Sequence, residues 1–132
     1  MENYTEQIKI NAQKINILKA RIDETVKFRD ENEYKLKEWQ KACSDFHKQY
    51  NELAFPGGFS GAYEKIKNGD PEAIEAALCF IECRPYFFRS GYMYKDIMRK
   101  LKKASMDTLQ TYRFKKVYNA YIEYRDSRNQ KI

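Results

Sequence analysis

Two pairs of side chains have the chemistry of metal ligands and the spacing of one helical turn. Cys43 and His47 are four residues apart, as are Cys79 and Cys83, so in helices each pair shares a face. If the two helices packed antiparallel, thiolate and imidazole groups could surround a tetrahedral zinc ion. The spacing differs from that of common zinc folds, and cysteine is an ordinary buried residue. We therefore expect buried free thiols with no metal or cofactor, and keep zinc as the minor alternative.

The same residues are the main candidates for catalysis. A cysteine beside the single histidine could form a nucleophile and base, but nothing in the sequence selects Cys43 or Cys79 for this role. The glycine-rich stretch FPGGFSG, residues 55–61, lacks the lysine and hydroxyl residue of a phosphate-binding loop. We expect a flexible connector there and a protein that is not an enzyme.

Aromatic and arginine side chains gather in RPYFFRSGYMY, residues 84–94. Tyrosine and arginine dominate protein-binding hot spots, and aromatic rings also stack on nucleic-acid bases. The structural alternative is a tight helix–helix corner, because five rings cannot all face water. Downstream, basic side chains surround an apolar helix face that includes Ile97 and Leu101. The predicted partner-binding residues are Arg84, Tyr86, Arg89, Tyr92, Tyr94, Arg99, Lys100, Lys102 and Lys103.

The stretch AALCFIECRPYFFRSGYMYKDIMRKLKKA, residues 76–104, resembles an element of small uncharacterised bacterial helical proteins. In that element an acidic residue and a proline precede FFRSGY and a basic helix. The resemblance covers under a quarter of the chain and leaves the N-terminal segment outside it. It implies a helical fold in a bacterial or mobile-element setting, and it carries no assigned activity.

The net charge of +6 belongs to the C-terminal third of the chain. Residues 1–55 hold ten basic and ten acidic side chains, residues 56–83 hold two and five, and residues 84–132 hold thirteen and four. This asymmetry indicates an anionic partner for the last segment, either an acidic protein surface or nucleic acid; the alternative is a soluble helical protein that simply has one basic face. We expect a protein partner and keep nucleic acid as the alternative, because no known DNA-reading motif accompanies the charge.

An apolar heptad pattern runs through the first 54 residues and becomes polar around Arg29. Two structures fit: one continuous helix, or a hairpin that turns near residues 30–32, where short polar side chains could cap a second helix. The unbroken phase and the lack of glycine or proline favour the continuous helix.

A long helix needs a partner for its apolar stripe. We expect a coiled-coil homodimer, and the alternative is that the stripe packs on the C-terminal helices of the same chain. The predicted oligomerisation residues are Ile8, Ile15, Leu18, Ile22, Leu36 and Trp39.

Glycine and proline lie almost wholly between Pro56 and Gly91, so helix is expected elsewhere. Asp70 and Pro71 are a strong helix start, and no stretch alternates with period two. The prediction is an all-α fold, with residues 1–54 as the long helix or helical hairpin, 55–61 as the connector and 62–132 as a compact bundle of four to five short helices. The expected short helices are 62–68 capped by Ser60, 71–83, 92–103, and one after Ser105 or Asp107 whose end from Asp126 is frayed.

Composition also suggests where the protein works. The chain has no apolar run near the ~20 residues of a membrane span, and its N-terminus is too polar for a secretory signal. Three cysteines, an odd number, suit a reducing compartment. We expect a cytoplasmic bacterial or phage protein, such as a regulator, immunity protein or inhibitor. It would assemble through its N-terminal helix, bind another protein through its aromatic-basic C-terminal surface, and avoid membranes.

Overall fold

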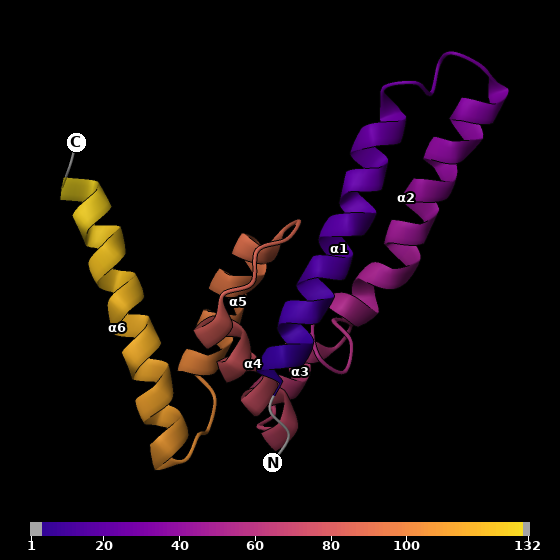
Figure 1. Ribbon diagram of the computed structural model, residues 1–132. Coiled ribbons are helices and arrows are strands. Elements are labelled where there is room, and N and C mark those ends of the chain that lie inside the picture. Colours follow the sequence, from indigo (N-terminus) through magenta and orange to yellow (C-terminus); the bar gives the residue numbers. More distant parts are fainter. Residues whose placement is uncertain (1–3, 131–132) are drawn as a thin grey trace.

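The computed structural model describes residues 4–130, which form helices joined by short connections (Figure 1). The described residues contain no strand, so the all-α prediction is confirmed. No helix in this range has the length and apolar character needed to cross a lipid bilayer. The helices are α1 (Thr5–Val26), α2 (Glu33–Ala54), α3 (Ala62–Lys67), α4 (Pro71–Cys83), α5 (Ser90–Lys102) and α6 (Thr108–Gln130).

Helices α1 and α2 form an antiparallel hairpin, so the continuous helix favoured by the heptad phase was wrong (Figure 1). In the turn, the Phe28 N–H donates to the Thr25 carbonyl at 3.2 Å and the Glu31 N–H to the Phe28 carbonyl at 3.0 Å. Asn32 Oδ1 then accepts from the Lys35 N–H at 2.8 Å and caps α2. No residue of this turn has a positive φ, so the turn requires no glycine.

Most apolar side chains of the heptad pattern pack against other parts of the same chain. Ile8 and Ile15 are 4% and 0% exposed, because α1 packs against both α2 and α4. Leu18 and Ile22 are half-buried against the same core, and Leu36 and Trp39 are half-buried on α2. The stripe therefore gives no reason to expect a second copy, and the homodimer stays a prediction.

Trp39 belongs to the half of α2 that adjoins the turn. The Arg29 guanidinium lies 4.9 Å from the centre of its ring, within cation–π range. The indole Nε1 is buried and has no hydrogen-bond partner among the described residues. Arg29, where the heptad pattern becomes polar, thus covers the Trp39 ring within the same hairpin.

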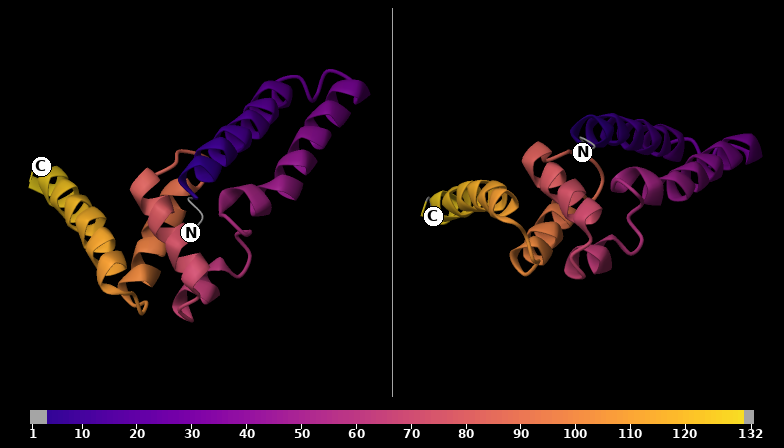
Figure 2. Two further views of the ribbon diagram at one scale, coloured as in Figure 1. Left: turned by 60° about the horizontal axis from the view of Figure 1, so that its bottom comes forward. Right: turned by 90° about the horizontal axis from the view of Figure 1, so that it is seen from below.

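The hydrophobic side chains form one core cluster centred on α4. Helix α4 lies among the other helices (Figure 2) and contacts α1, α3, α5 and α6. Its first turn is capped as predicted, since Asp70 Oδ1 accepts from the Ala73 N–H at 3.0 Å and Pro71 is the first helical residue. Ile15 of α1 and Phe114 of α6 both belong to this cluster. The predicted segments 1–54 and 62–132 therefore share a core.

Several predicted helix ends differ from the structure. Ser60 does not cap α3: the N-cap residue is Gly61, with φ 78°, and no side chain caps the helix. Helix α5 begins at Ser90, two residues before the expected start. Asp107 and Gln110 cap α6 reciprocally, through bonds of 2.7 and 3.2 Å. Helix α6 continues through Asp126 to Gln130, so the fraying predicted from Asp126 was wrong for residues 126–130, and residues 131–132 lie outside the described range.

Three buried or half-buried tyrosines make the fold sensitive to alkaline pH. Burial raises the pKa of Tyr50, Tyr63 and Tyr94 above the ordinary value of 10, and the nearby Asp96 carboxylate adds to the rise at Tyr63. The Tyr50 hydroxyl donates to the Phe88 carbonyl at 2.8 Å and the Tyr63 hydroxyl to Asp96 Oδ2 at 3.3 Å. Ionisation of these hydroxyls is therefore easier in the unfolded chain than in the folded one.

Because the folded pKa values lie above the unfolded value, the stabilisation is complete below pH 10 and is lost as the pH rises above it. We expect the urea midpoint to hold between about pH 7 and 9 and to fall steeply above about pH 10. Tyr63→Phe should make that fall shallower, since one of the three ionisations is removed. A midpoint that stays flat to about pH 11 would contradict this prediction.

Candidate functional site, an aromatic and basic groove

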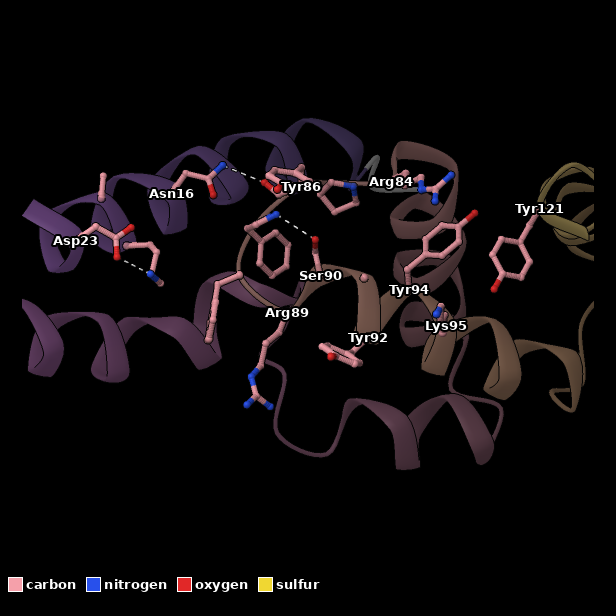
Figure 3. Close-up of a pocket in the computed structure, with 16 residues that line it drawn as sticks. Asn16, Asp23, Arg84, Tyr86, Arg89, Ser90, Tyr92, Tyr94, Lys95 and Tyr121 are labelled. Carbon is pink, nitrogen blue, oxygen red and sulfur yellow. Dashed lines mark hydrogen bonds and ion pairs between the residues drawn. The ribbon is translucent and has the colours of Figure 1, made fainter. Parts of the chain in front are cut away.

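A groove of about 1060 Å³ lies between α1, the connection of residues 84–89 and the first half of α5, with α6 at its edge (Figure 3). We call it the aromatic groove. Helix α1 contributes Asn16, Lys19, Ala20 and Asp23, and α6 contributes Tyr121. The remaining wall is the continuous run 84–92 with Tyr94 and Lys95. The segment that the sequence singled out therefore supplies most of the lining.

The 84–89 connection is anchored at its centre and exposed around it. Phe87 is buried, and its ring lies 6.3 Å from Phe80 and 6.2 Å from Tyr50. Its N–H donates to Ser90 Oγ at 3.0 Å, and Asn16 Nδ2 donates to the Tyr86 carbonyl at 2.9 Å (Figure 3). These contacts leave the Tyr86 side chain 88% exposed.

Two arginines occupy backbone conformations that normally favour glycine. Arg84, which ends α4, has φ 49°, and Arg89, which precedes α5, has φ 69°. A side chain in this region costs about 1 kcal/mol or more relative to glycine. Both arginines are exposed, so burial does not explain them. Strain of this kind gathers where a side chain is needed for function.

The groove carries an excess of positive charge. Lys19 pairs with Asp23 at 2.6 Å across one turn of α1. Within the described chain, Arg84, Arg89 and Lys95 have no carboxylate partner at ion-pair distance. The Arg84 guanidinium instead lies 4.8 Å from the centre of the Tyr94 ring. An anionic ligand would find unneutralised cations here.

The structure divides the predicted partner-binding residues into three groups. Arg84, Tyr86, Arg89 and Tyr92 line the aromatic groove and are exposed, Tyr92 by 73%. Tyr94 also lines it but is only 7% exposed, because its ring packs edge-on against Tyr121 at 5.9 Å (Figure 3). It is therefore a wall of the groove and not the exposed contact that was expected.

The remaining predicted residues follow Lys95 in the sequence and lie outside the aromatic groove. Arg99 and Lys102 line a smaller cleft of about 250 Å³ between α5 and α6, which we call the basic cleft. Lys100 and Lys103 line neither feature. The charged and tyrosine residues of the basic cleft are Lys95, Arg99, Lys102, Arg125, Tyr118 and Tyr121. Lys95 and Tyr121 line both features, so the two adjoin.

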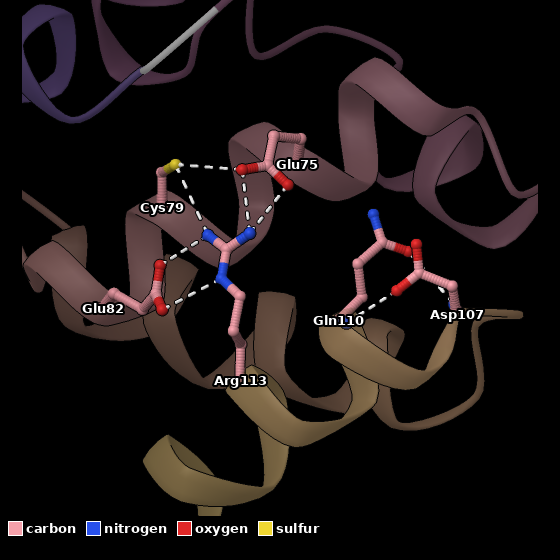
Figure 4. A network of polar contacts seen from close by, with 6 residues as sticks. All are labelled: Glu75, Cys79, Glu82, Asp107, Gln110 and Arg113. Carbon is pink, nitrogen blue, oxygen red and sulfur yellow. Dashed lines mark hydrogen bonds and ion pairs between the residues drawn. The ribbon is translucent and has the colours of Figure 1, made fainter. Parts of the chain in front are cut away.

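Arg113 of α6 fixes the position of that helix against α4 (Figure 4). Its Nη1 donates to both carboxylate oxygens of Glu75 at 2.8 Å, and its Nε and Nη2 donate to Glu82 at 3.1 and 2.6 Å. Nη2 also lies 3.8 Å from Cys79 Sγ. The two carboxylates, Glu82 foremost, raise the pKa of the guanidinium still further above its ordinary value. Sequence reasoning missed this network, which joins α4 to α6, the helix that carries Tyr121.

The cysteines and the histidine do not form a site in the described residues. Cys79 is buried, Cys43 and Cys83 are half-buried, and His47 is exposed. Among residues 4–130, no group of three or more His, Cys, Asp or Glu side chains could hold a metal ion. Burial raises the pKa of the Cys83 thiol, which disfavours the reactive thiolate at neutral pH.

The groove has the features of a binding surface, namely exposed tyrosines beside unpaired cations, and its lining shows no nucleophile paired with a base. The resemblance noted for residues 76–104 stays a prediction. No protein-family model matches the chain, and comparisons with curated proteins and with solved structures gave no significant match.

Proposed function

We propose that this is a protein-binding protein that takes an acidic segment of its partner into the aromatic groove. The observation that carries the proposal is the pair of exposed arginines, Arg84 and Arg89, held in left-handed backbone on either side of Tyr86. Neither arginine is buried, and neither forms an ion pair within residues 4–130. A bound partner would supply the missing reason for them.

The chemistry of the groove suits a protein partner. Tyrosine and arginine offer large contact areas and charge-assisted hydrogen bonds, and they are over-represented at binding hot spots. The unpaired cations favour an acidic segment and would speed its association at low salt. The proposal assigns no catalytic residue, and it keeps the cytoplasmic, bacterial or phage setting expected from the sequence, with a regulator, immunity protein or inhibitor as the kinds of role.

A single-stranded nucleic acid is the second candidate. Tyr86 and Tyr92 are 88% and 73% exposed beside Arg89, and single strands bind by stacking bases on such rings while cations meet the phosphates. This alternative predicts binding to DNA or RNA that falls steeply with salt but persists at physiological concentration. Weak, sequence-independent binding that disappears there would favour the protein partner.

The test is a quantitative pull-down from a lysate of the source organism. Three baits are compared: wild type, Tyr86→Ala/Tyr92→Ala in the groove, and Tyr112→Ala/Tyr124→Ala on α6. The control tyrosines are 65% and 55% exposed and lie outside the groove. We expect wild type and control to retain the same protein and the groove variant to lose it by about tenfold or more. Equal capture by all three baits, or capture that nuclease treatment abolishes, would overturn the proposal.

The strained backbone predicts a trade between stability and binding at Arg89. Asparagine adopts left-handed backbone more readily than arginine, so Arg89→Asn should raise the free energy of unfolding by up to about 1 kcal/mol. The same substitution should weaken partner capture. Urea titration and the pull-down measure the two effects. If Arg89→Asn instead lowered the free energy of unfolding and left partner capture unchanged, Arg89 would serve the stability of the fold and not binding.

A further inference from the structure

The basic cleft contains two positive charges that the protein does not neutralise. Arg99 pairs with Asp96, whose other oxygen accepts from the Tyr63 hydroxyl at 3.3 Å. Arg125 Nε lies 3.7 Å from Asp126. Lys95 and Lys102 have no carboxylate within ion-pair distance in the described chain. The cleft therefore presents a net charge close to +2.

Two tyrosine hydroxyls accompany these ammonium groups. Lys102 Nζ donates to the Tyr118 hydroxyl oxygen at 3.3 Å, which leaves the Tyr118 O–H proton available to an incoming acceptor. Tyr121 of α6 and Lys95 of α5 also line the cleft, at the part that adjoins the aromatic groove. The cleft thus offers ammonium and hydroxyl donors together, the combination that suits an oxyanion.

The positive charge and the volume of the basic cleft indicate which class of anion it could bind. A phosphate monoester carries about −1.5 to −2 at pH 7, whereas a carboxylate or a phosphodiester carries about −1. At about 250 Å³, the cleft is smaller than the roughly 300–1000 Å³ that holds a whole small-molecule ligand. It suits one charged group of a larger ligand, and it adjoins the aromatic groove at Lys95 and Tyr121.

We infer that the basic cleft binds a dianionic phosphate monoester carried by the partner segment that lies in the aromatic groove. Lys95 and Lys102 would meet the two negative charges, and the Tyr118 and Tyr121 hydroxyls would donate to the phosphoryl oxygens. This inference rests on the proposed function and names the partner more closely, as a phosphorylated acidic segment of a protein.

The test uses phenyl phosphate as the probe and benzenesulfonate as its monoanionic match, titrated into the ¹⁵N-labelled full chain at constant ionic strength and about pH 7.5. We expect amide shifts on α5 and α6 and an affinity for phenyl phosphate about tenfold higher than for benzenesulfonate. Binding should weaken towards about pH 5, where the phosphate loses its second charge. Equal affinity for the two probes would overturn the inference.

Matched variants assign the effect to the cleft. Lys95→Gln/Lys102→Gln should lower phenyl phosphate affinity about tenfold, whereas Lys65→Gln/Lys67→Gln, which removes the same charge from exposed positions on α3, should leave it unchanged. Unaltered affinity in the first variant, or an equal loss in both, would contradict the assignment. Binding of inorganic phosphate without binding of phenyl phosphate would also overturn it, because a partner-borne ester would then be excluded.

The pull-down separates this inference from the proposed function. Lys102 lines the basic cleft but not the aromatic groove. Loss of the captured protein from Lys102→Gln, and from wild type after phosphatase treatment of the lysate, supports the phosphorylated segment. Capture that depends on Tyr86 and Tyr92 but persists in Lys102→Gln or after phosphatase treatment would overturn the phosphate inference and leave the proposed function in place. If a single DNA strand without a terminal phosphate bound more tightly than phenyl phosphate, both the phosphate inference and the proposed protein-binding function would be overturned.

Discussion

Replacing Phe80 with alanine is expected to lower the free energy of unfolding by about 3–5 kcal/mol. The Phe80 side chain is 0% exposed, and its ring lies 6.1 Å from Phe55 and 6.3 Å from Phe87. Alanine would leave a cavity in the core beside α4. The helices packed around α4 limit how far that cavity can close. Urea titration followed by far-ultraviolet circular dichroism measures the loss.

Two further variants make the Phe80 prediction specific. Phe80→Leu retains most of the volume and should cost less, about 1.5 kcal/mol. Leu109→Ala is the surface control, since Leu109 is 66% exposed, and should change stability by no more than about 0.5 kcal/mol. Because Phe87 packs on Phe80, the alanine variant should also weaken partner capture by the groove. A loss near that of Leu109→Ala would contradict the central place given to α4.

Arg113→Ala is expected to lower the free energy of unfolding of α6 by about 2–3 kcal/mol. The substitution leaves the Glu75 and Glu82 carboxylates without their guanidinium, and the side chain of Glu75 is only 13% exposed. The loss should be smaller than for a fully buried pair, because the Arg113 side chain is itself 21% exposed. Amide hydrogen exchange should show the change mainly within residues 108–130.

Arg113→Lys and Lys115→Ala test the geometry of this network. Lysine keeps the charge but cannot donate to both carboxylates with a planar fork, so its effect should fall between wild type and alanine. Lys115 is exposed on the same helix, and its removal should leave exchange unchanged. Uniform loss of protection across all helices, instead of within α6, would show that Arg113 supports the whole fold.

Local chemistry in the sequence predicted some elements well. Asp70 and Pro71 mark the start of α4, and Arg84-Pro85 marks its end, because a cap and a proline act on the backbone beside them. The turn after α1 left no such mark. It closes with negative φ angles and with backbone bonds that any residue can make, so the heptad phase continued across it and suggested one helix.

The candidate site was predictable only where it is contiguous in the chain. Residues 84–94 were singled out because arginine and aromatic types cluster there, but the burial of Tyr94 depends on Tyr121, which tertiary packing brings to it. Asn16 reaches the Tyr86 carbonyl across 70 positions of sequence. The left-handed backbone at Arg89 has no sequence mark either, since glycine or asparagine is the residue usually found there.

Trp39 makes the outer end of the hairpin optically distinct from the rest of the molecule. It is the single tryptophan of the chain, it lies under the Arg29 guanidinium, and the hydrophobic core centred on α4 does not include it. Its fluorescence emission therefore reports whether the end of the α1–α2 hairpin is closed, while circular dichroism averages over all helices. If that end opens first, the emission transition will precede the dichroic one, and a two-state fit to either curve alone would misjudge the stability of the whole.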